Sequence, residues 1–256
     1  MRLRARHAVW LLLAAALVVA IGRWPEATAK DSTPAAILRW APAILRGFAI
    51  NILMSVLAMA AGTLGGGVPG IAQLAPRPRR RRAAWLATGF LRNAPWLVLL
   101  FYCVFLLPFQ VRVGSLLLPL PDWSKATFGL SLSVAGNVSE ILRGAIQSIP
   151  ATQWEAAESL AFTRRATLWR IILPQCLRRM LPPWMNLYAL LIMATPLTSI
   201  VGVNEAMTMT QAAISAEGRH DLVGPMYLCL MALFFVYSYP ISVWTERLER
   251  RYAAGS

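Results

Sequence analysis

The sequence is poor in charge, and above all in lysine. Only 14% of its 256 residues are charged, against about a quarter in soluble domains, whereas 57% are hydrophobic. Lysine occurs only at Lys30 and Lys125, and neither follows a glycine. This excludes a phosphate-binding loop that ends in Gly-Lys-Ser or Gly-Lys-Thr. Histidine is limited to His7 and His220, and the three cysteines lack metal-ligand or redox spacing. We therefore expect no metal site and no cofactor in this chain.

Charge is missing altogether from four long stretches. Residues 47–76, 93–111, 180–204 and 222–245 contain no charged residue, and these stretches are 30, 19, 25 and 24 residues long. A helix needs about 20 apolar residues to cross the bilayer core. In lipid only a helix satisfies its own backbone groups locally, and the strict alternation of a β-barrel is absent. The pattern predicts membrane spans at about 47–74, 93–111, 181–203 and 223–243.

Two further spans are predicted, at 8–22 and at 126–149. The fold class is therefore an all-α polytopic membrane bundle of about six spans. We expect an N-terminal span and outer segment in residues 1–44, and a five-span core in 45–256. The first run has only 15 uncharged residues, and Ala27-Thr28-Ala29 also fits a cleavable secretory signal. We favour an uncleaved span, because Trp10 and Trp24 bracket the run as interfacial anchors do.

The net charge of +14 comes from arginines in short segments beside the apolar runs. Such placement is typical of the arginine excess on cytoplasmic loops, and we do not expect nucleic-acid binding. With the N-terminus inside, sixteen basic residues fall on the inner side and seven on the outer side. The inner set includes the cluster in residues 77–82. Both termini are thus expected in the cytoplasm.

Several shorter segments are predicted between the spans. Residues 23–46 and 112–125 are expected to be outer segments, and 83–91 a short interfacial helix. Span two ends in Gly65-Gly66-Gly67 and Gly70. These glycines indicate either close helix approach or a fraying helix end.

Residues 150–180 form the longest inner segment and show helix signals of their own. Thr152 and Glu155 have the spacing of a capping box, and Thr163 is suited to cap a second helix. Pro174 is expected to break or kink that helix. Two short helices joined near Ala161 could bind in the groove of a partner, or could lie on the membrane surface.

This segment resembles the EAA loop of ABC-importer permeases. The family pattern is Glu-Ala-Ala, three residues, Gly, nine residues, Ile, one residue, Leu-Pro. The matching positions here are Glu155, Ala156, Ala157, Ala161, Ile171, Leu173 and Pro174. Ala161 replaces the family's glycine, so a positive φ at this position would cost about 1 kcal/mol, or the first helix would continue through it.

Neighbouring stretches are similar to polar amino-acid permeases, chiefly residues 140–150, and the resemblance covers about residues 45–251. It implies a transport subunit, not an enzyme, in a bacterial inner membrane. The implied partners are a second permease, identical or paralogous, cytoplasmic ATPase subunits that bind the ATP, and an external substrate-binding protein. Alternative functions are a permease for another small solute, a secondary transporter or an intramembrane enzyme.

A second set of residues indicates a substrate pathway. Glu140 could meet a substrate amino group, or could simply pair with Arg143 one turn away. Thr195, Thr198 and Ser199 surround Pro196 in the fifth predicted span. They could form a gate, or could only satisfy the carbonyl groups that the proline leaves free.

Overall fold

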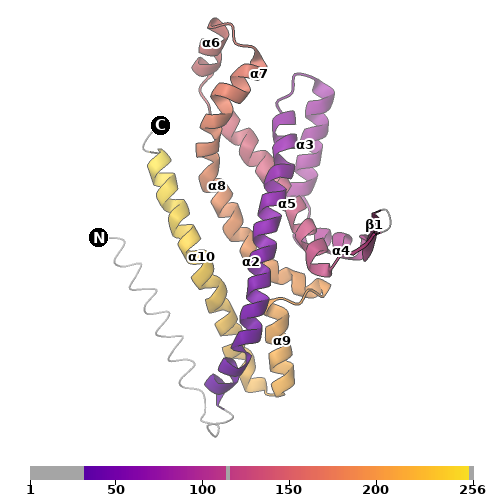
Figure 1. The fold of residues 1–256 in the computed structure, drawn as a ribbon. Helices are drawn as coiled ribbons and strands as arrows, with labels where there is room; N and C mark the ends of the chain where they lie inside the picture. Colours follow the sequence, from indigo (N-terminus) through magenta and orange to yellow (C-terminus); the bar gives the residue numbers. More distant parts are fainter. Residues whose placement is uncertain (1–31, 114–115, 254–256) are drawn as a thin grey trace, which may run out of the picture. The chain divides into compact units, whose positions relative to one another are not determined.

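The computed structural model of this protein describes residues 32–113 and 116–253 (Figure 1). The predicted apolar run at 8–22, and the signal sequence considered as its alternative, lie outside the described residues. Contacts between residues divide the described chain into two compact units. One consists of residues 32–50 and 204–235, and the other of residues 51–203 and 236–253.

Long apolar helices dominate the described residues. Helix α2 (Thr33–Ala72), the helical stretch Arg164–Val201 and the stretch His220–Arg251 are each long and apolar enough to cross a membrane. The last of these includes α10 (Val223–Ala253). The predicted outer segment 23–46 is corrected in part, because α2 already begins at Thr33. Pro34 lies in its first turn, where the N–H that proline lacks would have had no helical partner.

In place of the predicted span at 93–111 the structure has a bent pair of helices. Helix α3 (Pro78–Asn93) and helix α4 (Trp96–Leu106) meet at 97°, and only together are they long and apolar enough for a membrane segment, either a broken span or a re-entrant loop. The bend falls at Pro95, whose missing N–H and ring prevent the helix from continuing. The short interfacial helix predicted at 83–91 is therefore part of the longer α3.

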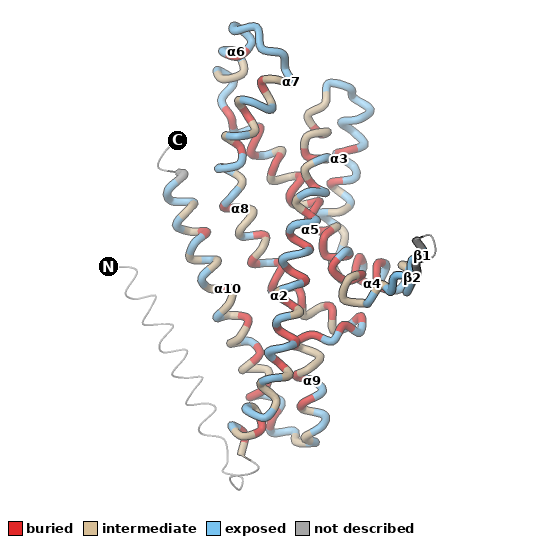
Figure 2. The backbone as a smooth tube through the Cα atoms, viewed as in Figure 1, coloured by how far each residue is buried: buried red, intermediate tan, exposed pale blue. Residues whose placement is uncertain are grey.

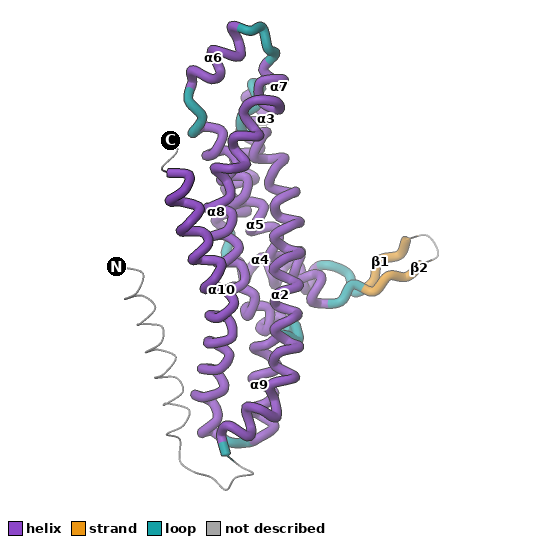
Figure 3. The backbone as a smooth tube through the Cα atoms, turned by 60° about the vertical axis from the view of Figure 1, so that its left-hand side comes forward, coloured by secondary structure: helices purple, strands orange, loops and turns teal. Residues whose placement is uncertain are grey.

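A small β-hairpin follows α4 where the sequence predicted an outer loop (Figure 3). Strands β1 (Gln110–Val113) and β2 (Leu116–Pro119) pair antiparallel, with Val111 opposite Leu118. Beside them Lys125 is almost fully buried. Its ammonium group lies 2.8 Å from the Asp122 carboxylate, donates to the Val104 carbonyl at 3.2 Å, and lies 4.1 Å from the centre of the Phe109 ring. These contacts replace the lost hydration of the charge.

Helix α5 (Asp122–Gln147) is the core of the larger unit, and most of its length is buried (Figure 2). It contacts α3, α4 and α8 (Leu173–Ala194). It also contacts α2 through a stripe of glycines at every fourth position, Gly62, Gly66 and Gly70. An added Cβ at Gly66 would lie 2.5 Å from the Ala135 carbonyl oxygen, so only glycine allows this approach. At Gly67 an added Cβ meets nothing within 4 Å. Close approach is thus the correct interpretation at Gly66.

A buried polar trio of Gln73, Thr88 and Ser139 joins the end of α2 to α3 and α5. The amide nitrogen of Gln73 donates to the hydroxyl of Thr88 at 3.1 Å and to that of Ser139 at 2.9 Å. The two hydroxyls lie 2.8 Å apart. Hydrogen bonds between side chains are an effective way to hold helices together in lipid, where apolar burial gives no advantage. The trio fixes α3 against the core.

Contacts to α9 (Ala206–Glu217) hold the smaller unit together. The Glu205 side chain caps α9 by accepting from the backbone N–H groups of Met207 at 3.0 Å and Thr208 at 2.9 Å. Glu217 accepts from Trp40 at 2.8 Å and from Arg39 at 3.0 Å. A 3-10 turn (η3, His220–Leu222) leads into α10. The predicted outer loop between spans five and six is therefore mostly helical.

We expect Gly66→Ala to destabilise the protein by about 1–3 kcal/mol, because the new Cβ would press on backbone atoms of α5. Gly67→Ala is the matched control, and it should be neutral or slightly stabilising, because alanine favours a helix interior over glycine. The thermal unfolding midpoint of the purified protein in detergent measures both. Equal midpoints for the two variants would contradict the close approach.

Candidate functional site

The candidate site is the two-helix segment between α5 and α8. Helix α6 covers Ala151–Ser159, and helix α7 covers Arg164–Thr167. The predicted capping box of Thr152 and Glu155 is wrong. The extended backbone of Pro150 starts α6 two residues earlier, so that Thr152 already lies inside the helix. No side chain caps this helix start.

A left-handed residue at Ala161 ends α6. Its φ is +57°, the only positive value at a non-glycine residue in the described chain. The N–H of Phe162 donates to the Ala157 carbonyl at 3.0 Å, and the N–H of Ala161 donates to the Glu158 carbonyl at 2.8 Å. These two bonds form a Schellman motif, whose left-handed position is normally glycine. Of the two outcomes expected for Ala161, the turn is kept and the alanine is strained, at a cost of about 1–2 kcal/mol.

The second helix begins as the sequence predicted. The Thr163 hydroxyl accepts from the backbone N–H of Ala166 at 3.3 Å and caps α7. Pro174 does not end the helix. One π-helical turn (η1, Leu168–Ile172) precedes it, and α8 then continues as one helical stretch. A π-turn accommodates the carbonyl that would otherwise face the proline ring and its missing N–H.

The segment is anchored to the ends of α5 and α8 by apolar packing. Ile172 and Cys176 are fully buried against Leu142 and Ile146 of α5 and against Ile149, which follows it. Two residues of the EAA pattern, Ile171 and Leu173, pack at the border of this cluster. Burial of one such side chain contributes about 1.5–3 kcal/mol.

Polar contacts add to the anchor. Gln175 of α8 donates to the side-chain oxygen of Gln153 in α6 at 2.6 Å. Arg179 donates to the Ser148 carbonyl at 2.7 Å, where a positive charge also complements the C-terminal end of α5. The segment is thus linked to α5 and α8, and a movement of its tip has a direct route into both helices.

The tip itself faces outward. Within the Glu-Ala-Ala triplet, Ala157 is buried, while Glu155 and Ala156 are exposed. Two large apolar side chains beside them are also exposed, Leu160 at 72% and Phe162 at 38%. A carboxylate next to exposed apolar groups is typical of a surface that binds another protein. Exposed apolar side chains are also compatible with a membrane surface, so both interpretations of the segment stay open.

A charge cluster lies further along α5. Both carboxylate oxygens of Glu140 pair with Arg143, whose Nε donates at 3.0 Å. Arg92, at the end of α3, approaches the same carboxylate at 3.7 Å. Arg143 also donates to the Gln147 side chain at 2.7 Å. The pairing of Glu140 with Arg143 is therefore present, and Arg92 is a partner that the sequence did not indicate.

The threonines near Pro196 lie on another element, a 3-10 helix that continues α8 (η2, Thr195–Val201). Thr195 and Thr198 are fully buried, and each hydroxyl donates at 2.8 Å to a carbonyl three residues earlier. Ser199 does the same toward Pro196 at 2.7 Å. Asn51 of α2 donates to the Thr195 hydroxyl at 2.9 Å. In this conformation the three hydroxyls satisfy carbonyl groups at the kink, as one of the two sequence interpretations expected.

Long apolar helices with an anchored, outward-facing helical segment define a membrane-embedded transport subunit. The chain belongs to the family of binding-protein-dependent transport system inner membrane components, which it matches over residues 67–254.

Relatives with assigned names support this membership. The chain is 32% identical over 212 residues to the probable amino-acid ABC transporter permease protein YckA of Bacillus subtilis (strain 168), covering 83% of this chain and 90% of the relative. It is 32% identical over 185 residues to the L-cystine transport system permease protein TcyB of the same organism, covering 71% and 75%.

Solved structures share the fold. A chain from the crystal structure of an amino acid ABC transporter with histidines aligns with a TM-score of 0.72 at 21% identity, over 84% of this chain and 96% of that one. A chain of the MetNI methionine ABC transporter in an inward-facing conformation aligns with a TM-score of 0.64 at 15% identity, over 81% and 95%.

We expect Ala161→Gly to stabilise the turn by about 1 kcal/mol, because glycine has no Cβ to strain at positive φ. The amide protons of Ala161 and Phe162, which close the turn, should then exchange about fivefold more slowly with solvent. Ala156→Gly is the opposite control, since it should weaken the interior of α6. Faster exchange in Ala161→Gly would show that the positive φ is wrong. Transport should be retained in this variant.

Proposed function

We propose that this chain is the permease subunit of an ATP-driven importer of polar amino acids, and that ATP is bound and hydrolysed by a separate cytoplasmic subunit. The observation that carries the proposal is the EAA pattern, set on an exposed helix pair that is anchored to the membrane helices. Two relatives, a probable amino-acid permease and an L-cystine permease, support the substrate class.

The coupling surface consists of Glu155, Ala156 and the exposed apolar residues beside them. It would bind in a groove of the ATPase subunit, with Ala161 closing the turn that presents it. Closure of the ATPase pair would then move the helix pair as a body. The buried Ile172 and the Arg179 contact would pass that movement to α5 and α8, and nucleotide would select between two arrangements of the spans.

The proposed topology follows the distribution of arginine. Residues 77–82, the segment 150–174 and both termini would lie in the cytoplasm, with the hairpin and α9 outside. An external substrate-binding protein would deliver the solute to the outer side. A second permease, either a second copy or a paralogue, would complete the pathway.

The substrate pathway is proposed to include Glu140 and Arg143, with Thr195, Thr198 and Ser199 as gate residues. The guanidinium groups of Arg92 and Arg143 meet at the Glu140 carboxylate. If these ion pairs opened, the guanidinium groups would bind the carboxylate of an amino acid, and Glu140 would bind its amino group. Intramembrane charges of this kind usually face a pathway or a partner, because lipid does not solvate them.

Glu155→Lys should leave the protein inserted but uncouple it. The substitution reverses the charge of an exposed residue on the coupling surface. The proposed groove of the ATPase subunit would then face an ammonium group in place of a carboxylate. We expect at least a tenfold loss of the ATPase stimulation that the loaded binding protein causes in the reconstituted complex. Glu249→Lys makes the same charge change on exposed α10 and should have little effect. Unchanged stimulation in Glu155→Lys would refute the coupling role.

Glu140→Gln should lower amino-acid uptake about tenfold at an equal amount of assembled complex. The amide keeps the shape of the side chain but loses a charge-assisted hydrogen bond worth about 1.5–3 kcal/mol. Uptake in cells is compared with the quantity of complex purified from the same membranes. If uptake and assembly fall in proportion, and Arg143→Gln combined with Glu140→Gln restores assembly, then the ion pair is only structural.

A further inference from the structure

An amphipathic pocket of about 910 Å³ lies in the larger unit, between the ends of α2 and α5 and the α6–α7 segment. One part of its wall is apolar and comes from the ends of the long helices, including Ile71, Leu74 and Ile146. The other part carries guanidinium groups, from Arg80 at the start of α3 and from Arg164 and Arg165 of α7. Apolar and strongly basic walls thus face one open pocket.

The three arginines have no counter-charge in the described part of the chain. None of them forms an ion pair or a side-chain hydrogen bond there, although Glu140, Glu217 and Asp221 are each paired with another arginine. All three side chains are exposed. Three guanidinium groups around one space attract an anion, and their planar donors are suited to phosphate oxygens.

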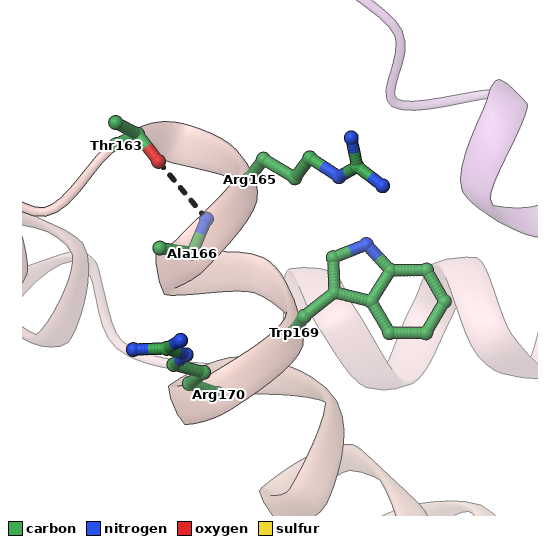
Figure 4. Close-up of a pocket in the computed structure, with 5 residues that line it drawn as sticks. All are labelled: Thr163, Arg165, Ala166, Trp169 and Arg170. Carbon is green, nitrogen blue, oxygen red and sulfur yellow. Dashed lines mark hydrogen bonds between the residues drawn. The ribbon is translucent and has the colours of Figure 1, made fainter.

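Tryptophans complete the lining. Trp154 and Trp169 both line the pocket, and Trp169 is 56% exposed. A smaller hollow of about 480 Å³ adjoins it and shares Arg165 and Trp169 (Figure 4). In Figure 4 the side chains of Arg165 and Trp169 point to the same side of the helix, and Arg170 points to the other. Tryptophan beside arginine is typical of the membrane–water boundary.

Helix α3 continues this boundary. Five arginines lie in residues 77–82, and the rest of the helix exposes a large apolar face of Trp85, Leu86 and Phe90. Its opposite face, with Ala84 and Thr88, is buried. A basic start followed by exposed aromatic and apolar side chains is typical of a helix whose first turn lies at anionic headgroups and whose later turns meet the acyl chains.

We propose that the pocket binds an anionic phospholipid of the inner leaflet, with the phosphate among Arg80, Arg164 and Arg165 and the upper acyl chains against Ile71, Leu74 and Ile146. Free phosphate would make no use of the apolar wall. Glu155 and Ala156 do not line the pocket, whereas Trp154 and Arg165 of the same helix pair do, so the pocket lies beside the proposed ATPase surface and does not include its tip. The inference rests on the proposed orientation, which puts this pocket on the cytoplasmic side.

The test titrates the purified full-length chain in detergent with phosphatidylglycerol or with phosphatidylcholine of the same acyl chains. Native mass spectrometry counts the lipids that remain bound. We expect phosphatidylglycerol to be retained preferentially, and Arg80→Gln to weaken that binding about fivefold. Arg81→Gln removes the same charge from the next exposed position of α3, which does not line the pocket, and should change binding less than twofold. Arg80→Lys should retain most of the binding.

Four results would overturn the proposal. Equal losses in Arg80→Gln and Arg81→Gln would indicate diffuse attraction without a pocket. Equal retention of the two lipids would exclude anion recognition. Displacement of the lipid by millimolar inorganic phosphate would indicate a site for a soluble anion, and displacement by the ATPase subunit would assign the pocket to that interface. The assay involves neither nucleotide nor transport, so its failure would leave the importer function untouched, and the reverse also holds.

Discussion

The larger unit depends on how closely the backbone of α5 approaches that of its neighbours. Lipid is as apolar as a leucine side chain, so helices gain little by hiding apolar groups from it, and association relies on dispersion contact and hydrogen bonds. Gly66 brings α2 against the Ala135 carbonyl, and Gly136 brings α5 against the backbone at Arg92. Because α5 is surrounded in this way, it can carry polar and charged residues that a lipid-facing helix could not.

The same contacts position both candidate sites. Close packing of α3 against α5 brings Arg92 to Glu140, and the trio around Gln73 holds that arrangement. At the other end, α5 supplies the apolar cluster that anchors the coupling segment through Ile172. A change in the position of α5 would therefore be felt at the charge cluster and at the coupling surface together. If the two sites have the proposed roles, this shared helix would link substrate binding to nucleotide binding.

The sequence predicted those features whose causes are local. Long uncharged stretches indicated the apolar helices, the signals in residues 150–180 indicated two short helices, and Thr163 was recognised as a cap. The strain at Ala161 could be foreseen as one of two outcomes, because a turn residue's φ depends on hydrogen bonds formed within a few residues.

Features that depend on distant partners could not be foreseen. Lys125 looked like a loop cation, yet Asp122, Val104 and Phe109 enclose it. The partnership of Arg92 with Glu140 likewise requires knowledge of where α3 lies on α5. The early start of α6 shows the opposite limit: two overlapping local signals were present, and the backbone of Pro150 prevailed over the capping residues.

The π-turn before Pro174 fixes the rotational phase of the coupling segment. One residue inserted into a helical turn rotates everything before it by about 100° relative to everything after it. Ile172 can therefore face the core while the residues of α7 point in directions that an unbroken α-helix would not give them. Loss of a single residue from 168–172 would change no other residue of the segment. It would nevertheless rotate the proposed coupling surface away from the groove that it is proposed to bind. Length in this short stretch is consequently as constrained as residue identity.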